Sequence, residues 1–457
     1  MITRTCASSL GLVAALALAA CSDGGDADGV GEAPQDEVSI APPVQALLGR
    51  VLFDLAFPGT NGRACGTCHV PGEHTTLRPA GVTARLAHDP YDPLFNVIDA
   101  DDPTAAALTF DHLRAGLVRV SLPMADNIDV VDADGKVVTG SNRTIQVWRA
   151  VPTVENTAYT APYQLDGRIA TLPEQALQAL INHSRITYQP DAGLLGFLSA
   201  YESTVFSSPR AAAVAAAILA GVTPPDPQPV LAPGSDAQRG QGIFQQACAP
   251  CHGGPRGNQI LDEAAHDMLF PVLNQDGSVS LATLSDDTVV PAQVRHDHAG
   301  DRFLNIGIAG GTYLGQVGLF PNFTGVSFPQ YRVRFYADAS RQTPVVDLPP
   351  PPPLVGPNLI PQAFSVDPGR AITSGDPADF EAFDVPQLRG IKHTAPYFHD
   401  NSAPDLATMV DIYSRFILRQ LPSLNLPLVN PPEGPGLPPE SLSPAQKKQL
   451  IAYLERI

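Results

Sequence analysis

The sequence predicts a mainly α-helical protein with two domains in tandem and long irregular insertions. Three observations support this fold class. The chain has 457 residues, enough for two to four domains with real cores. Its 47 prolines and 38 glycines interrupt the backbone often, which predicts short helices between irregular segments. The same pattern, C-x-x-C-H, occurs once in each half, and a helix is predicted ahead of each copy.

The first predicted helix leads into the first C-x-x-C-H motif. Apolar residues recur there at positions i, i+3, i+4, i+7 and i+8, which is the spacing of one helix face. They are Val44, Leu47, Leu48, Val51 and Leu52. The pattern therefore predicts an amphipathic helix with one continuous apolar face.

A second helix is predicted ahead of the second motif. Ser235 and Gln238 form a capping-box pattern at its start, and we expect Ile243 and Phe244 to face the pocket of that motif. The proline-rich stretch 222–233 cannot be helical and predicts the domain boundary. A closing helix is predicted from Ser443 as N-cap to Leu454.

The first residues predict an export signal. A short segment with Arg4 leads into the apolar run 10–20, which ends in a Leu-Ala-Ala-Cys sequence resembling a bacterial lipobox. An acylated Cys21 would tether the protein to a membrane in the periplasm. The acidic, glycine-rich residues that follow would form a solvated spacer. The alternative is an ordinary cleaved signal in which Cys21 has no role.

Composition excludes two broad classes of function. Charged residues make up only 16% of the chain and the formal net charge is −18, so the protein is neither a highly charged disordered polymer nor a nucleic-acid binder. An acidic surface favours a basic redox protein as partner through electrostatic steering.

The two C-x-x-C-H motifs carry the chemistry. Their residues are Cys65, Cys68, His69, Cys248, Cys251 and His252. This spacing is the attachment signature of c-type haem, in which two thiols bond one porphyrin and the adjacent His binds its iron. A zinc site that joins all four thiols is an alternative, but it leaves a His after each pair unexplained. A thioredoxin-like dithiol would need a βαβ context, which neither motif has.

The sequence therefore predicts two covalent haems in two tandem cytochrome c-type haem domains. We divide the chain into a lipoprotein signal peptide (1–20), an acidic tether (21–41), an N-terminal haem domain (42–222), a proline-rich linker (223–236) and a C-terminal haem domain (237–457).

The order of motifs resembles the bacterial dihaem cytochrome c peroxidase and MauG superfamily. The matching stretches are 48–54, 149–153, Asn156, 166–168, Gln175, 385–390 and 394–400. The segments 70–148 and 253–383, which include the polyproline run 349–353, look like insertions. The resemblance implies that peroxide reacts at the N-terminal haem and that the C-terminal haem is a six-coordinate electron-transfer centre.

The resemblance also implies a sixth ligand for the C-terminal haem. It lies fourteen residues after the His of the Tyr-x-His motif, and His399 places it at Tyr413. The peroxidases have Met there and MauG has Tyr, so the position favours the MauG-like branch. In the alternatives, Tyr413 belongs to the core of an apolar helix or Met409, one turn earlier, is the ligand. His399 is interpreted as a neighbour of a haem propionate.

Three family residues are replaced in this chain. The Trp between the haems is Leu165, for which Trp148 or Tyr163 could substitute as a relay. The Glu of the peroxide pocket is Arg185, and the Asn that binds an interdomain calcium is Ala150. The backbone carbonyls of Thr394 and Pro396 still offer calcium ligands, so the sequence leaves a calcium site open.

Three residues are predicted to serve peroxide cleavage at the N-terminal haem. His183 would act as base, Arg185 would stabilise the developing charge, and Gln175 would complete the pocket. The alternative is that Arg185 pairs with a propionate or a surface acid and that His183 is structural. No His lies near Asn142, where the peroxidases carry a removable ligand, which predicts an open or weakly ligated iron.

The first functional hypothesis is a peroxide-reducing oxidoreductase that receives electrons from a small cytochrome c or cupredoxin. A second is MauG-like or rubber-oxygenase-like oxidation of a protein or organic substrate, with peroxide or O2 as oxidant. A third is a non-catalytic electron carrier.

Overall fold

The computed structural model describes residues 43–226, 228–266, 270–274, 276, 278–284, 286–294, 302–308, 325–349, 364–418 and 440–457. The predicted signal peptide, Cys21 and the tether lie outside these residues, so their assignment stays a prediction. Within the described residues, no helix is long and apolar enough to cross a membrane.

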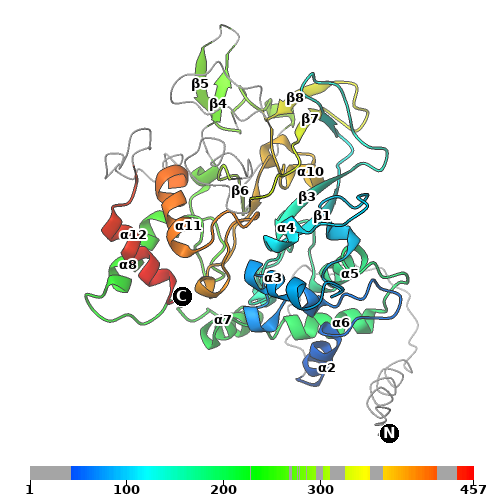
Figure 1. Ribbon diagram of the computed structural model, residues 1–457. Coiled ribbons are helices and arrows are strands. Elements are labelled where there is room, and N and C mark those ends of the chain that lie inside the picture. The colour runs from blue at the N-terminus through cyan, green and yellow to red at the C-terminus, as the bar shows by residue number, and fades with distance from the viewer. Residues whose placement is uncertain are drawn as a thin grey trace, which may run out of the picture.

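Helices gather at two ends of the molecule (Figure 1). Those of the first half are α2 (Pro43–Phe53), α3 (Pro79–His88), α4 (Asp111–Arg114), α5 (Leu172–Asn182), α6 (Ala192–Glu202) and α7 (Pro209–Leu219). Those of the second half are α8 (Asp236–Ala247), α10 (Ala371–Ser374), α11 (Leu406–Ile412) and α12 (Pro444–Leu454).

Helix α2 forms where it was predicted, but it packs on a different face. A Cβ on Gly49 would lie 1.8 Å from the carbonyl oxygen of Phe197, so α2 and α6 touch through their backbones at this glycine. Phe53, which is buried, extends the contact. Val44 and Leu47 remain 68% and 64% exposed, because the contact with α6 is centred on another side of the helix.

The second half repeats this arrangement with α8 and α12. A Cβ on Gly240 would lie 1.9 Å from the carbonyl oxygen of Gln449, and the Phe244 ring packs 5.1 Å from the ring of Tyr453. Phe244 therefore fills the contact between the two helices and does not line the pocket of the motif. Ile243 is also absent from that pocket. Both pocket assignments were wrong, because the close approach at Gly240 turns this face toward α12.

Predicted helix starts are confirmed at both caps. The Ser235 side chain accepts a hydrogen bond from the Gln238 amide, as the capping pattern predicts. The reciprocal bond differs, since the Gln238 side chain accepts from the amide of Gly234. Ser443 caps α12 in a full capping box with Gln446.

The predicted irregular insertions contain antiparallel strands, so the fold is helical with a β component. β1 (Leu117–Pro123) pairs with β3 (Thr144–Ala150), β4 (Phe270–Leu273) with β5 (Val279–Ala282), and β6 (Phe303–Leu304) with β9 (Phe383–Asp384). A three-stranded sheet has the order β2 (Ile128–Val131), β7 (Arg332–Tyr336), β8 (Pro344–Leu348).

That three-stranded sheet joins the two halves of the chain. β2 belongs to the first insertion, whereas β7 and β8 belong to the second, and all three strands contribute to one hydrophobic core. Leu122 and Ile128 from the first half pack there with Phe335 and Ile372 from the second. In space, the two insertions therefore share one core, and β7 and β8 lie above β1 and β3 (Figure 1).

A buried ion cluster also links the two halves of the chain. Arg149, at the end of β3, donates to Asp166 at 2.8 Å and to Asp367 at 2.6 Å, and all three side chains are buried. The two carboxylates hold the pKa of Arg149 above its usual range despite its burial.

Arg149→Met should therefore destabilise the protein strongly. The variant leaves Asp367 buried without its cation, and losing one partner of a buried pair costs about 3–5 kcal/mol. Urea unfolding followed by circular dichroism measures the change. Arg114→Met removes an exposed ion pair with Asp111 and should change stability by no more than about 0.5 kcal/mol. Equal effects of the two variants would show that the buried cluster contributes little.

Candidate functional site

The first C-x-x-C-H motif borders a cavity of about 160 Å³. Its cysteines begin a 3-10 turn, Cys65–Thr67, and the His69 amide donates back to the Cys65 carbonyl at 2.9 Å. The turn places both thiols and the His69 ring on the cavity wall. The Nδ1 of His69 lies 3.0 Å from the Thr75 carbonyl, an arrangement that leaves Nε2 as the available ligand atom.

Helix α5 supplies another wall of the same cavity. Gln175 and His183 both line it, so the structure brings these two predicted residues together with His69. Burial lowers the pKa of His183 to about 4. The imidazole is therefore neutral at physiological pH and able to accept a proton.

Arg185 does not join them. It follows the end of α5 with a left-handed backbone (φ +54°), and its side chain is exposed to solvent outside the cavity. The predicted role of this guanidinium in the peroxide pocket was wrong, because the left-handed turn at Arg185 directs its side chain outward, although Ser184 before it still lines the cavity.

Glu202 is a cavity residue that sequence reasoning missed. It ends helix α6, is only 4% exposed and lines the cavity beside Cys65 and Tyr163. The signal was a single acidic residue at the end of an otherwise apolar helix, which by itself looks like an ordinary helix terminus.

The second motif borders a larger cavity of about 300 Å³, lined by Cys248, Cys251 and His252. The Nδ1 of His252 lies 2.9 Å from the Pro386 carbonyl, which again leaves Nε2 available. Burial lowers the pKa of this imidazole to about 4, so it is neutral, the form that binds a metal.

Tyr413 and Met409 line this second cavity together. Tyr413 begins a π-helical turn, Tyr413–Ile417, directly after α11, and such turns occur often at functional sites. Burial raises the pKa of its phenol, and Cys248 and Cys251 add to the shift, which places the hydroxyl near both thiols. The side chain is therefore positioned toward the motif.

His399 also borders the second cavity. It is buried, its ring stacks 4.5 Å from the Phe383 ring, and neither ring nitrogen has a hydrogen-bond partner among the described residues. Such unpaired buried nitrogens fit a carboxylate of a bound group. Thr394 and Pro396 border the cavity as well, and their assignment to calcium stays a prediction.

One strip of chain separates the two cavities. Ala150–Thr153 and Leu165 line both of them, so the wall at Leu165 is aliphatic where the family resemblance predicts Trp. Tyr163 lines the first cavity only. Trp148 lines neither cavity and stacks instead on His112 at 4.0 Å.

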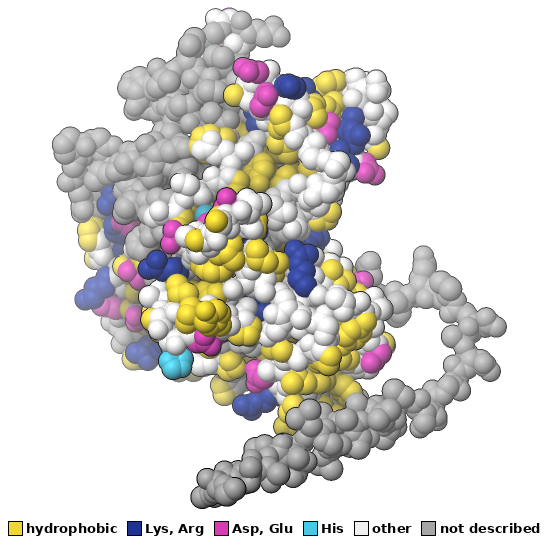
Figure 2. All heavy atoms as spheres, turned by 45° about the vertical axis from the view of Figure 1, so that its right-hand side comes forward, with side chains coloured by type: hydrophobic (Ala, Val, Ile, Leu, Met, Phe, Trp, Pro, Cys, Tyr) yellow, Lys and Arg dark blue, Asp and Glu magenta, His cyan; other side chains and the backbone are white. Residues whose placement is uncertain are grey.

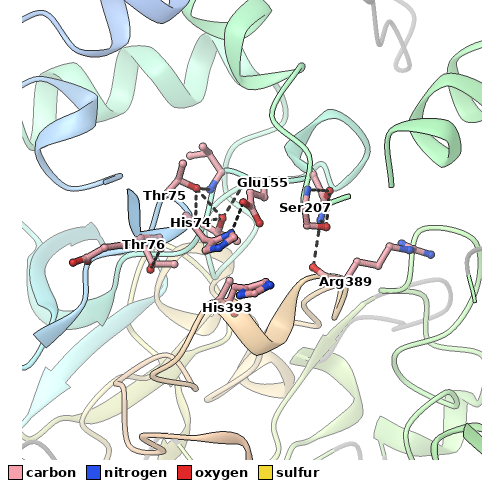
Figure 3. Close-up of polar contacts among 12 residues, drawn as sticks. His74, Thr75, Thr76, Glu155, Ser207, Arg389 and His393 are labelled. Carbon is pink, nitrogen blue, oxygen red and sulfur yellow. Dashed lines mark hydrogen bonds and ion pairs between the residues drawn. The ribbon is translucent and has the colours of Figure 1, made fainter. Parts of the chain in front are cut away.

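The loop after the first motif contacts the second half directly (Figure 3). The His74 ring stacks on that of His393 at 4.2 Å, and its Nδ1 lies 3.0 Å from Glu155. Nearby, Asn156 donates to the Arg389 carbonyl. His74 is next to Thr75, which contacts His69 of the first cavity, and His393 is next to Thr394 of the second cavity. These contacts therefore connect the walls of the two cavities.

The donor groups fit haem better than a metal cluster. The four free thiols divide between two cavities, and no group of three or more His, Cys, Asp or Glu within the described ranges could hold a metal ion. The zinc alternative required all four thiols together. Each cavity instead offers two thiols and one imidazole along an apolar wall, the donor set of one haem c.

Known proteins share limited similarity with the chain. No protein-family model matches the chain. Over 91 residues it is 35% identical to cytochrome-c peroxidase IdrP2 of Denitromonas iodatirespirans; the matched stretch covers 20% of this chain and 21% of that protein. The chain is therefore similar to this peroxidase over about a fifth of that protein's length.

The chain also has low-identity similarity to solved structures. A MauG-like protein associated with microbial copper homeostasis is 16% identical, with 93% of this chain and 91% of that chain covered and a TM-score of 0.41. The dihaem peroxidase BthA from Burkholderia thailandensis E264 is also 16% identical, with 92% and 87% covered and a TM-score of 0.36.

Proposed function

We propose that the protein is a dihaem c-type oxidoreductase that reduces hydrogen peroxide at its first cavity, with electrons entering through the second. The observation that carries the proposal is the difference between the cavities. The first combines His69 with a neutral His183 and Gln175, whereas the second places Tyr413 near its thiols. The proton-accepting His183 in the first cavity suits a reaction with peroxide. The additional candidate ligand Tyr413 in the second cavity suits electron transfer.

Haem would be held by Cys65, Cys68 and His69, and it would supply the iron chemistry that passes two electrons to peroxide. The residues of the chain handle the protons. Neutral His183 would accept a proton from one peroxide oxygen and return it to the departing oxygen. The Gln175 amide orients the peroxide by hydrogen bonding, and apolar residues such as Leu172 and Leu180 exclude bulk water.

The overall reaction consumes two electrons and two protons for each peroxide and forms two waters. The electrons come from a small reduced redox protein. The described surface in Figure 2 carries interspersed acidic and basic side chains on the face shown, while the sequence has a net charge of −18. That excess of negative charge favours a basic donor such as a cytochrome c.

Steady-state oxidation of a basic ferrocytochrome c tests the function. We expect oxidation that requires both the dihaem protein and peroxide, with two cytochromes oxidised for each peroxide. A high-spin ferric spectrum should accompany it, because an open iron is needed. A fully low-spin protein that does not react with peroxide would instead support an electron carrier.

Tyr413 favours a second candidate, MauG-like oxidation of a protein or organic substrate. A phenolate is a hard anionic ligand that stabilises ferric iron and lowers the potential, whereas a thioether raises it.

Tyr413→Phe should therefore change the ferric absorption spectrum of the C-terminal haem and raise its midpoint potential by about 0.1 V or more, since axial ligands tune haem potentials over about 0.8 V. Spectroelectrochemistry measures both. Met409→Leu, in the same cavity, is the matched control and should leave them unchanged. If the Met409 variant shifts the potential and the Tyr413 variant does not, the thioether is the ligand and the MauG-like candidate loses its support.

A further inference from the structure

Glu202 is a buried acid in the first cavity. The peroxide cleavage proposed for His183 does not involve it. Its backbone is fixed at the end of α6, where its carbonyl accepts hydrogen bonds from Val205 and from the Thr157 hydroxyl. Its side chain borders the cavity that holds the first motif. The carboxyl group therefore lies where a charge on the bound haem would act on it.

The carboxyl group has no compensating charge. Within the described part of the chain, no ion pair or hydrogen bond reaches its oxygens, and burial raises its pKa to about 8. Asp99, buried near the same cavity, contrasts with it, because Asp99 pairs with Arg63 at 2.6 Å. An unpaired buried acid is costly, which favours a functional role over a structural one.

The groups around Glu202 do not provide that charge. Cys65 would become a neutral thioether on haem attachment, and the Tyr163 hydroxyl donates to the Thr157 carbonyl. From helix α2, Arg50 and Asp54 are both exposed and of opposite sign. From helix α5, His183 is neutral. None of these groups changes its charge on reduction, so the charge that varies with redox state is that of the iron.

We propose that Glu202 is the redox-linked proton site of the first haem, binding a proton when the iron is reduced and releasing it when the iron is oxidised. One electron from the donor converts ferric to ferrous iron, and one proton from solvent converts the carboxylate to the acid. The proposal rests on haem binding in the proposed function and not on the peroxide reaction.

The coupling follows from Coulomb attraction. A carboxylate stabilises the more positive ferric state, so its proton affinity is lower beside ferric than beside ferrous iron. At an effective dielectric constant of about 20, one unit of charge roughly 10 Å away changes proton affinity by about tenfold to thirtyfold. The midpoint potential of the first haem should therefore fall as pH rises through the interval between the two pKa values.

Redox titration of the dihaem protein between pH 6 and 10 tests this coupling. In the wild type, the potential of the first haem should fall with pH over about one unit and level off on either side. Glu202→Gln should remove this fall and match the wild type at low pH. Asp54→Asn is the control, because Asp54 also faces Cys65 but is exposed. It should retain the fall.

Infrared difference spectra of the wild type provide a second readout if the Gln variant folds poorly. Reduction near pH 8 should produce a protonated carboxyl band. An unchanged pH dependence in Glu202→Gln with both haems present, or a wild type without the band, would overturn the proposal. A first cavity without haem would instead overturn the proposed function, and haem content measured on the same samples separates these outcomes.

Discussion

The double variant Cys248→Ala, Cys251→Ala is expected to lose one covalent haem and to keep the other. Each thiol pair lines its own cavity with its own His, so attachment at one motif does not need the thiols of the other. Protein expressed with a cytochrome c maturation system should carry two haems in the wild type and one in the variant. Mass spectrometry of denatured protein measures this directly, because thioether-bound haem survives denaturation.

The mirror variant, Cys65→Ala with Cys68→Ala, should lose the other haem and with it the reaction with peroxide. Haem staining of denaturing gels from whole cells gives the same comparison if either variant is unstable. Bound zinc in the wild type, or a wild type with one haem, would contradict both the proposed cofactor and the proposed function.

The second large effect is expected at His183. His183→Ala should slow the reaction of the ferric protein with peroxide by about a hundredfold or more, the usual contribution of a positioned general acid or base. Stopped-flow absorbance measures the rate. Arg185→Ala is the matched control two residues away, and it should react like the wild type because its side chain is exposed outside the cavity.

The pH dependence gives an independent check. Burial lowers the pKa of His183 to about 4, so the base is neutral above that pH and protonated below it. The wild-type rate should be constant from about pH 5 to 7 and fall as pH drops through 4, and this fall should be absent from the residual rate of His183→Ala. Equal rates in wild type and His183→Ala would remove His183 from the reaction. A slow Arg185→Ala variant would restore the role predicted for Arg185.

Among the cavity residues, the sequence predicted the positions that depend on near neighbours in the chain and missed those that depend on distant ones. Gln175 lies in helix α5 and His183 is the C-cap of the same helix. Their joint position in the cavity therefore depends mainly on local helix geometry. Arg185 lies only two residues further on, yet the left-handed turn there reverses the direction of its side chain. Glu202 reaches the cavity from a different helix, and no local pattern around it indicates the contact.

The sequence alone determined the features that depend on neighbours along the chain. The C-x-x-C-H spacing places two thiols and an imidazole within one turn, and Ser235 and Ser443 cap helices through bonds to residues three positions later. Tertiary structure decided the rest. The pairing of β2 with β7 joins residues about 200 positions apart, and Gly49 and Gly240 select which helix faces meet. Whether a side chain is buried in a cavity or exposed beside it depends on such distant contacts, because burial is a property of the packed chain and not of the local sequence.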